Sequence, residues 1–186
     1  MTVLGSPWFW AALCAAGYLA TLASLGPGKM RHLVYTRIPK GMIVAFMMIF
    51  IMLPPVALPF ARGPKIGLPL WMAAVAGGAV FAANVVIKIM SQKKIGAVPA
   101  LKQKGTLVTD GIYRVVRHPL YMSNGMLALG MALLMNSLYA LLFSIPYSLG
   151  FLLIIHFEER MLIEQYGEEY RAYQRRVPWR MIPKLI

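Results

Sequence analysis

The stretch Leu120–Phe157, LYMSNGMLALGMALLMNSLYALLFSIPYSLGFLLIIHF, decides the fold class of this protein. It consists of two apolar runs, Leu120–Met135 and Leu138–Phe157, with only Asn136 and Ser137 between them. An α-helix needs about 20 residues to cross the hydrocarbon layer of a membrane, so the second run is long enough for one span and the first is somewhat short. Together the two runs predict a tight antiparallel hairpin of membrane helices.

Three more apolar runs precede this hairpin in the sequence: Pro7–Leu25, Met42–Phe60 and Leu68–Met90. The chain has 186 residues, of which 59% are hydrophobic, and its mean hydropathy is +0.64. A soluble domain of this size could not bury so much apolar surface. We therefore expect an all-α, polytopic membrane protein with about five transmembrane helices and a cytosolic C-terminal helical segment.

Prolines and glycines inside the runs predict local features of these helices. Pro54, Pro55 and Pro59 should distort the second helix, and Pro146 the fifth, because proline removes a backbone hydrogen bond of the helix. The pair Gly77-Gly78 in the third run indicates a close approach to a neighbouring helix.

Basic residues are distributed unevenly over the connections between the runs. The chain has 19 Lys and Arg against 6 Asp and Glu, a net charge of +13. The second connection holds only Arg62 and Lys65 and the hairpin turn holds none, whereas the remaining connections and the tail are rich in Lys and Arg. Because Lys and Arg mark cytoplasmic loops, we expect the N-terminus outside and the C-terminus in the cytoplasm, which in a bacterium means the inner membrane.

Neither nucleic-acid binding nor a cleaved signal peptide accounts well for these features. Nucleic-acid binding is disfavoured as the reason for the positive charge because no soluble stretch is long enough for a nucleic-acid-binding domain. A cleaved signal peptide is disfavoured because no Lys or Arg precedes the first apolar run, which is also longer than a typical signal core.

Two polar clusters flank the hairpin. The first is Gly105–Tyr121, GTLVTDGIYRVVRHPLY, and the second is His156–Pro183, HFEERMLIEQYGEEYRAYQRRVPWRMIP. A hairpin returns the chain to the side of the membrane where it started, so both clusters should meet at the cytoplasmic surface. Arg117-His118 then precede one helix and Glu158-Glu159 end its antiparallel partner, which brings opposite charges within reach of each other.

Pro119 suits the first turn of a helix, where the missing N–H costs nothing. The free N–H groups that follow it and the positive end of the helix dipole, together with Arg117 and His118, could hold a carboxylate or a phosphate. The alternative is that Arg117 and His118 only anchor the helix among the lipid headgroups.

The pair Glu158-Glu159 is unusual because the topology rule does not require acidic residues at the inner end of a span. Adjacent helical residues differ by about 100° in direction, so one Glu can face a pocket while the other pairs with Arg117 or Arg160. The alternative is an ordinary surface pair, such as Arg160 with Glu164. Farther on, a stripe at helical spacing should pack against the membrane interface or the site: Leu162, Tyr166, Tyr170, Tyr173 and Val177.

Several common motifs are missing from the sequence. It has no Walker loop, no GxGxxG after a strand and no HExxH, so the soluble nucleotide-binding and zinc templates do not apply. Cys14 is the only cysteine, which excludes an internal disulfide and a cysteine metal site and is typical of a small buried hydrophobe. We expect no bound metal.

The RHP box (Arg117–Pro119, followed by Leu120 and Tyr121), the helical hairpin and the later EERMLIEQYGEEYRAYQRRVPWRMIP resemble, in this order, the isoprenylcysteine carboxyl methyltransferase family. That superfamily also includes membrane phospholipid N-methyltransferases, and the resemblance covers roughly Gly105–Pro183. It implies a membrane enzyme that uses S-adenosyl-L-methionine without a Rossmann domain. Residues 93–186 would bind this cofactor on the cytosolic side, residues 1–92 would form a scaffold of three spans, and a lipophilic methyl acceptor would arrive laterally from the membrane lipids.

The resemblance also implies site residues. Glu158 and Glu159 match the acidic pair of the family, one of which sits near the acceptor or the cofactor. The other cofactor contacts that it implies are Thr106, Leu107, Val108, Tyr113, His118, Pro119 and Tyr121.

Methyl transfer is an in-line displacement at a sulfonium, so positioning and the exclusion of water can supply most of the acceleration. Glu158 or Glu159 would stabilise or orient the cationic cofactor, and Arg117 would hold its carboxylate. These three are the candidate catalytic residues.

Three positions depart from the family pattern. Ile154 stands where carboxyl methyltransferases have an Arg that helps to place the prenylcysteine carboxylate. Gly105 replaces a His that is common in eukaryotic members, and Val98 stands where an upstream Gln is expected. The acceptor therefore stays open: an isoprenylcysteine-like carboxylate, a phospholipid amine or another membrane-soluble molecule. An amine or thiol acceptor would need a base, for which a Glu or His156 is a candidate.

Two functions besides methyl transfer stay open. Membrane sterol reductases, which use NADPH, resemble the RHP box and the ending YQRRVPWRMIP, but EExxLxxxYGxEY and about five spans are closer to the methyltransferases. The chain could instead be a transporter or scaffold without enzymatic activity. Against a transporter, no ionisable residue lies at the middle of a span and no internal repeat is apparent.

Overall fold

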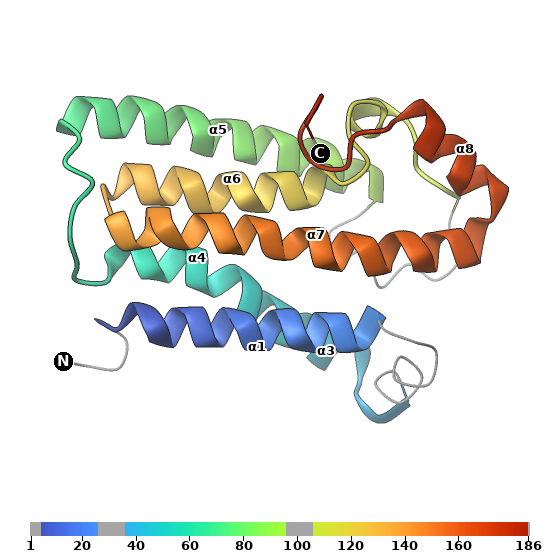
Figure 1. Ribbon diagram of the computed structural model, residues 1–186, viewed down its shortest axis with the longest axis horizontal. Coiled ribbons are helices and arrows are strands. Elements are labelled where there is room, and N and C mark those ends of the chain that lie inside the picture. Colours follow the sequence, from blue (N-terminus) through green and yellow to red (C-terminus); the bar gives the residue numbers. More distant parts are fainter. Residues whose placement is uncertain (1–4, 26–35, 96–105, 186) are drawn as a thin grey trace.

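The computed structural model of the protein describes residues 5–25, 36–95 and 106–185, and the named elements in this part of the chain are all helices. The helices lie side by side as an elongated bundle (Figure 1). Val98 and Gly105 lie outside the described residues. The long and short α-helices are α1 (Pro7–Leu25), α3 (Lys40–Met47), α4 (Leu53–Ala57), α5 (Leu70–Ile95), α6 (Pro119–Leu134), α7 (Leu138–Tyr166) and α8 (Glu168–Arg176).

Three helices, α1, α5 and α7, are long and apolar enough to cross a membrane, while α6 and the run Ile49–Phe60 are shorter apolar helices. This architecture confirms the expected all-α, polytopic membrane fold. The described bounds of α1 agree with the predicted run, whereas α7 continues beyond Phe157 as a polar extension to Tyr166.

The second predicted span is a chain of short helical pieces. Between α3 and α4 the backbone widens into a π-helical turn, η2 (Met48–Met52), and after α4 it tightens into a 3₁₀ turn, η3 (Leu58–Phe60). Pro54 and Pro55 cause this change, because their rings lack an N–H and clash with the carbonyl one turn earlier. The expected distortion of the second helix is thus confirmed, while α7 runs without a break through Pro146.

Helices α5 and α6 approach each other closely at two glycines. A Cβ atom added at Gly77 would lie 2.5 Å from the backbone nitrogen of Leu134, and one added at Gly130 would lie 3.0 Å from that of Phe81. Close packing at Gly77 is therefore confirmed. Gly78 has no part in it, since a Cβ there would meet nothing within 4 Å.

The predicted hairpin is confirmed: α6 and α7 are joined only by residues 135–137. Asn136 adopts a positive φ of 52°, and the Ser137 hydroxyl accepts the N–H of Ala140 at 3.4 Å to cap α7. The core beneath the hairpin contains Cys14 of α1, which is buried among Phe151 and other apolar side chains. Cys14 is thus a small buried hydrophobe, as expected.

Candidate functional site

The first polar cluster forms a short irregular segment between α5 and α6. It turns through a 3₁₀ helix, η5 (Gly111–Arg114), which begins at Gly111 with a φ of 62°. Lys94 at the end of α5 donates to the Asp110 carboxylate, and this hydrogen bond lowers the pKa of Asp110. The segment leads to His118, and α6 begins at Pro119 as predicted.

The Glu159 carboxylate, near the end of α7, is the centre of a buried ionic cluster. Arg117 donates from Nε and Nη2 to Oε1 at 2.8 and 2.7 Å. Arg180 of the tail donates to Oε2 at 3.2 and 3.1 Å, and His118 Nε2 lies 3.3 Å from Oε1. The predicted proximity of Arg117 and the acidic pair is confirmed, and Glu159 is the member of the pair that Arg117 contacts.

The environment of Glu159 keeps it ionised. The residue is 4% exposed and lies beyond the apolar run Leu138–Phe157. Burial on its own would raise the pKa of this carboxyl, but the hydrogen bonds and charges of His118 and Arg117 outweigh burial and lower the pKa to about 2. Glu159 is therefore a paired carboxylate with both oxygens engaged.

Glu158 has a different environment. Its Oε2 atom is buried and has no hydrogen-bond partner among the described residues; His118 Nδ1 is 3.8 Å away, too far for a hydrogen bond. The Tyr113 hydroxyl is likewise buried without a partner in the described part of the chain. Burial and the charge of Glu158 raise the pKa of Tyr113, which keeps its hydroxyl neutral.

Aromatic rings connect this site to the core of the bundle. His118 stacks on Tyr121 with ring centroids 5.8 Å apart, and Tyr121 stacks on Phe151 of α7 at 5.1 Å. The ring of His118 is thus held between an ionic side, formed by the two glutamates, and an apolar side that faces the membrane helices.

The C-terminal tail pairs with the RHP box through its backbone. The N–H of Arg117 donates to the carbonyl of Trp179 at 2.9 Å and the N–H of His118 donates to that of Arg180 at 2.8 Å. Arg117 Nη1 also donates to the Val177 carbonyl at 2.6 Å. The sequence did not reveal these supporting contacts: the ending RRVPWRMIP is visible in it, but nothing local indicates that this ending folds back onto the box.

The aromatic stripe packs on the first polar cluster, which was one of the two places predicted for it. Tyr170 and Tyr173 are buried in a cluster with Tyr113, and the partly buried side chains of Leu107 and Val108 pack against it. The Tyr173 hydroxyl donates to the carbonyl of Tyr113 at 2.7 Å, and burial raises the pKa of Tyr173. The stripe therefore fixes the segment on which the expected cofactor contacts lie.

The remaining predicted residues differ in exposure. Thr106 is exposed at the start of the described segment, and His156 is exposed on α7. Ile154 is 1% exposed and belongs to the apolar core under the site. The position that carries an Arg in carboxyl methyltransferases is thus buried among apolar side chains here.

Comparison with known proteins shows that about half of the chain matches a known protein family. Residues 72–169 match the family described as phospholipid methyltransferase. A protein-S-isoprenylcysteine O-methyltransferase of Schizosaccharomyces pombe is 42% identical over 73 residues, which are 39% of this chain and 31% of that protein. Methanethiol S-methyltransferase 2 of Bradyrhizobium diazoefficiens is 38% identical over 78 residues, 42% of this chain and 29% of that protein.

A protein with another activity is also similar. A Delta(14)-sterol reductase of Methylotuvimicrobium alcaliphilum is 34% identical over 90 residues, 45% of this chain and 20% of the reductase. The chain thus spans less than a third of the length of each of these three relatives.

Proposed function

The chain belongs to the phospholipid methyltransferase family, and from this premise we propose that it transfers a methyl group from S-adenosyl-L-methionine to a lipophilic acceptor. One observation carries the proposal: Glu158 presents a buried carboxylate oxygen without a partner among the described residues, beside the fully paired Glu159. Both glutamates and the RHP box lie within the matched residues 72–169. A buried acceptor without a partner calls for an explanation, and a bound ligand that donates to it would supply one.

The side chains around Glu158 suit S-adenosyl-L-methionine as the methyl donor. The unpaired acceptor atoms, Glu158 Oε2 and Tyr113 Oη, fit a molecule that carries positive charge and hydrogen-bond donors. S-adenosyl-L-methionine supplies an electrophilic methyl group on a sulfonium cation. Glu158 would stabilise that positive charge and Tyr113 would accept a hydrogen bond. The other proposed contacts are Thr106, Leu107, Val108, His118, Pro119 and Tyr121.

Arg117 and Glu159 have a positioning role in this proposal. The Arg117 guanidinium donates to Glu159 and to the Val177 carbonyl, so each of its three nitrogens already has a partner within the protein. Glu159 in turn accepts hydrogen bonds from the side chains of Arg117 and Arg180. These contacts hold the RHP box, the end of α7 and the tail together, and they thereby keep Glu158 and His118 in place.

The side chain at position 154 bears on the class of methyl acceptor that we propose. A buried Ile154 offers no charge to a prenylcysteine carboxylate, so a neutral or amine-bearing lipophilic acceptor is favoured. An amine or thiol acceptor must lose a proton, and Glu158 is the proposed base because it has a free carboxylate oxygen. The basic residues of the tail support a cytoplasmic position for this end of the bundle, with the N-terminus outside.

A second candidate function is the reduction of a sterol-type lipid with NADPH. The similarity to a Delta(14)-sterol reductase over 90 residues supports it. The family match and two methyltransferase relatives favour methyl transfer.

Calorimetric titration of the detergent-purified protein with S-adenosyl-L-methionine, its demethylated product and NADPH tests the proposal. We expect both sulfur compounds to bind and NADPH not to bind. The Glu158→Gln variant should weaken binding of the sulfonium compound about tenfold or more, because one desolvated charge contact is lost. It should affect the demethylated product less, because that product lacks the sulfonium charge. Glu169→Gln, which removes an exposed carboxylate from α8, is the matched control.

Binding of NADPH alone would overturn the methyltransferase proposal. Equal affinities of wild type and Glu158→Gln for the sulfonium compound would refute the role of Glu158. Transfer of a labelled methyl group to lipid extracts then identifies the class of acceptor.

A further inference from the structure

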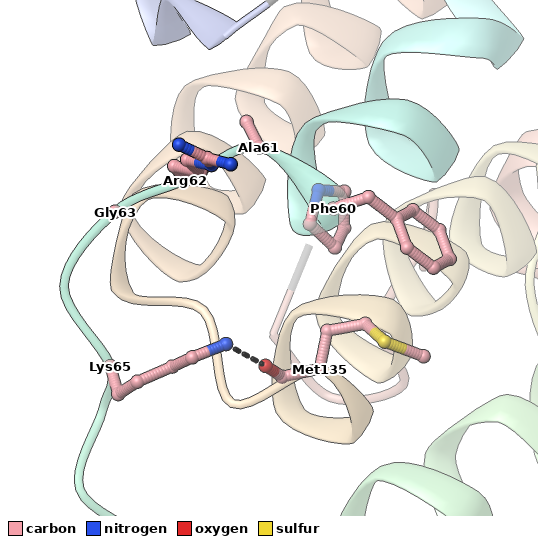
Figure 2. Close-up of a pocket in the computed structure, with 7 residues that line it drawn as sticks. Phe60, Ala61, Arg62, Gly63, Lys65 and Met135 are labelled. Carbon is pink, nitrogen blue, oxygen red and sulfur yellow. Dashed lines mark hydrogen bonds between the residues drawn. The ribbon is translucent and has the colours of Figure 1, made fainter.

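A hollow lies at the end of the bundle opposite the ionic cluster. It has a volume of ≈ 430 Å³ and lies between η3 and the α6–α7 turn, with Phe60, Arg62, Lys65 and Met135 in its lining. Figure 2 shows Arg62 and Lys65 on the connection that follows η3, with Met135 across from Lys65. From this end to Glu158, α7 rises about 30 Å at 1.5 Å per residue, which matches the thickness of the hydrocarbon core.

The wall that carries Lys65 is fixed to the hairpin turn. Lys65 Nζ donates to the Met135 carbonyl at 3.2 Å, and the N–H of Ile66 donates to the Asn136 carbonyl at 3.0 Å. The Asn136 side chain also donates to the Leu68 carbonyl at 2.8 Å and accepts the N–H of Leu68 at 3.3 Å. The Lys65 ammonium keeps two further N–H donors. The lining is therefore held in place by hydrogen bonds.

The hollow carries positive charge without a compensating carboxylate. Arg62 and Lys65 are the charged residues of its lining. All six acidic residues of the chain belong to the segments at the other end: Asp110, Glu158, Glu159, Glu164, Glu168 and Glu169. The charge of this end is therefore complementary to an anion.

An exposed apolar stripe leads to the hollow along the second helical run. Ile49, Leu53, Val56 and Phe60 are 50%, 43%, 38% and 66% exposed. They follow one another along η2, α4 and η3, and Phe60, the last of them, belongs to the lining of the hollow. In a protein with membrane-spanning helices, such a stripe contacts acyl chains.

Exposed aromatic residues mark the same end as a membrane–water interface. Trp8, at the start of α1, and Trp71, at the start of α5, are 81% and 68% exposed. Tryptophan side chains concentrate at the level of the lipid headgroups. A lipid phosphate at this level would be next to the two basic residues.

We propose that this hollow binds the phosphate of an anionic phospholipid, with Arg62 and Lys65 as its contacts and one acyl chain along the stripe Ile49–Phe60. A zwitterionic lipid would bring an ammonium group for which this end has no carboxylate. The separation of about 30 Å from Glu158 makes this lipid a bound component of the fold and not a methyl acceptor.

The test uses the full-length protein in a neutral detergent. Phosphatidylglycerol, phosphatidylcholine with the same acyl chains, and inorganic phosphate are added in separate titrations, with native mass spectrometry and melting temperature as readouts. We expect phosphatidylglycerol to bind preferentially and to raise the melting temperature. The variant Arg62→Gln/Lys65→Gln should bind phosphatidylglycerol about 30-fold more weakly, which corresponds to about 2 kcal/mol. The two basic residues should contribute about equally to this binding free energy.

Two further variants keep the result interpretable. Arg37→Gln/Lys184→Gln removes two exposed positive charges from the other end of the bundle and should bind phosphatidylglycerol as wild type does. Arg62→Gln on its own leaves the Lys65–Met135 hydrogen bond intact and should show part of the loss without a change in folding. Equal binding of the two lipids, an unchanged affinity of the double variant or an equal loss in the control would each overturn the proposal. Binding of inorganic phosphate as tight as that of phosphatidylglycerol would also overturn it, because the site would then not be specific for a lipid.

Discussion

Glu158 and Glu159 are neighbours in the sequence, yet their carboxylates have opposite environments. Glu159 accepts hydrogen bonds from the side chains of Arg117 and Arg180, whereas Glu158 has a buried oxygen without a partner among the described residues. The rotation of about 100° between adjacent helical residues turns the Glu159 carboxylate toward Arg117 and Arg180 and leaves the Glu158 carboxylate beside the other side of the His118 ring. The same rotation would allow a single acidic pair to serve both the positioning and the binding that we propose.

The pKa of Glu159 predicts a pH dependence of stability. Because the pKa falls from its ordinary 4.5 to about 2 in the folded protein, the unfolded chain takes up the proton first. Pairing of Glu159 therefore stabilises the fold fully above about pH 4.5, and this contribution is lost as the pH falls toward about 2. The melting temperature of the protein in detergent should decrease across this interval.

The variant Glu159→Gln separates this group from the other carboxylates. Its melting temperature should be lower than that of wild type near neutral pH, and the difference should shrink as the pH falls. Glu169→Gln should follow wild type. Parallel curves for wild type and Glu159→Gln would show that Glu159 does not produce the pH dependence.

Among the elements, the contact of α5 with α6 determines how the polar segment is held. This segment begins after α5 and ends where α6 starts, so any separation of the two helices moves both of its anchors. Gly77 and Gly130 allow the two backbones to approach closely, which suits helices that associate in lipid through small residues.

Gly77 and Gly78 provide a matched pair of variants for this contact. A Cβ at position 77 would lie 2.5 Å from the Leu134 backbone nitrogen, while one at position 78 would meet nothing within 4 Å. Gly77→Ala should therefore destabilise the protein by about 1–3 kcal/mol, as overpacking does. Gly78→Ala should leave stability unchanged or slightly higher because Ala favours helix. Melting temperatures in detergent measure both, and equal values would contradict the close contact at Gly77.

For the whole molecule, the orientation in the membrane stays a prediction that labelling can test. Cys14 is the only cysteine of the chain, so Cys14→Ala gives a background for single new cysteines. In this background Arg62→Cys should react with a membrane-impermeant maleimide in intact cells, because the positive-inside rule places that end outside. Arg175→Cys should react only after permeabilisation. The reverse pattern would place the ionic cluster outside.

Much of this fold could be predicted because hydrophobicity and short connections act locally. The runs Pro7–Leu25 and Leu138–Phe157, the turn between α6 and α7 and the helix start at Pro119 all follow from neighbouring residues. The division of the second span into short helices is less predictable in detail. Prolines predict that the helix is distorted, but they do not predict that a π-helical turn forms there. The division of the chain near residue 92 stays a prediction.

The sequence by itself determined the membrane class, the hairpin and the residue types that meet where α6 begins and α7 ends. Only the tertiary structure decided that Glu159 pairs with Arg117 and Arg180, that Glu158 keeps an oxygen unpaired within the described chain, and that the tail binds the RHP box. The physical reason is the path of the chain. Gly167, with a φ of 57°, ends α7 and redirects α8, so the contacts of Arg180 depend on the whole route and not on its neighbours in sequence.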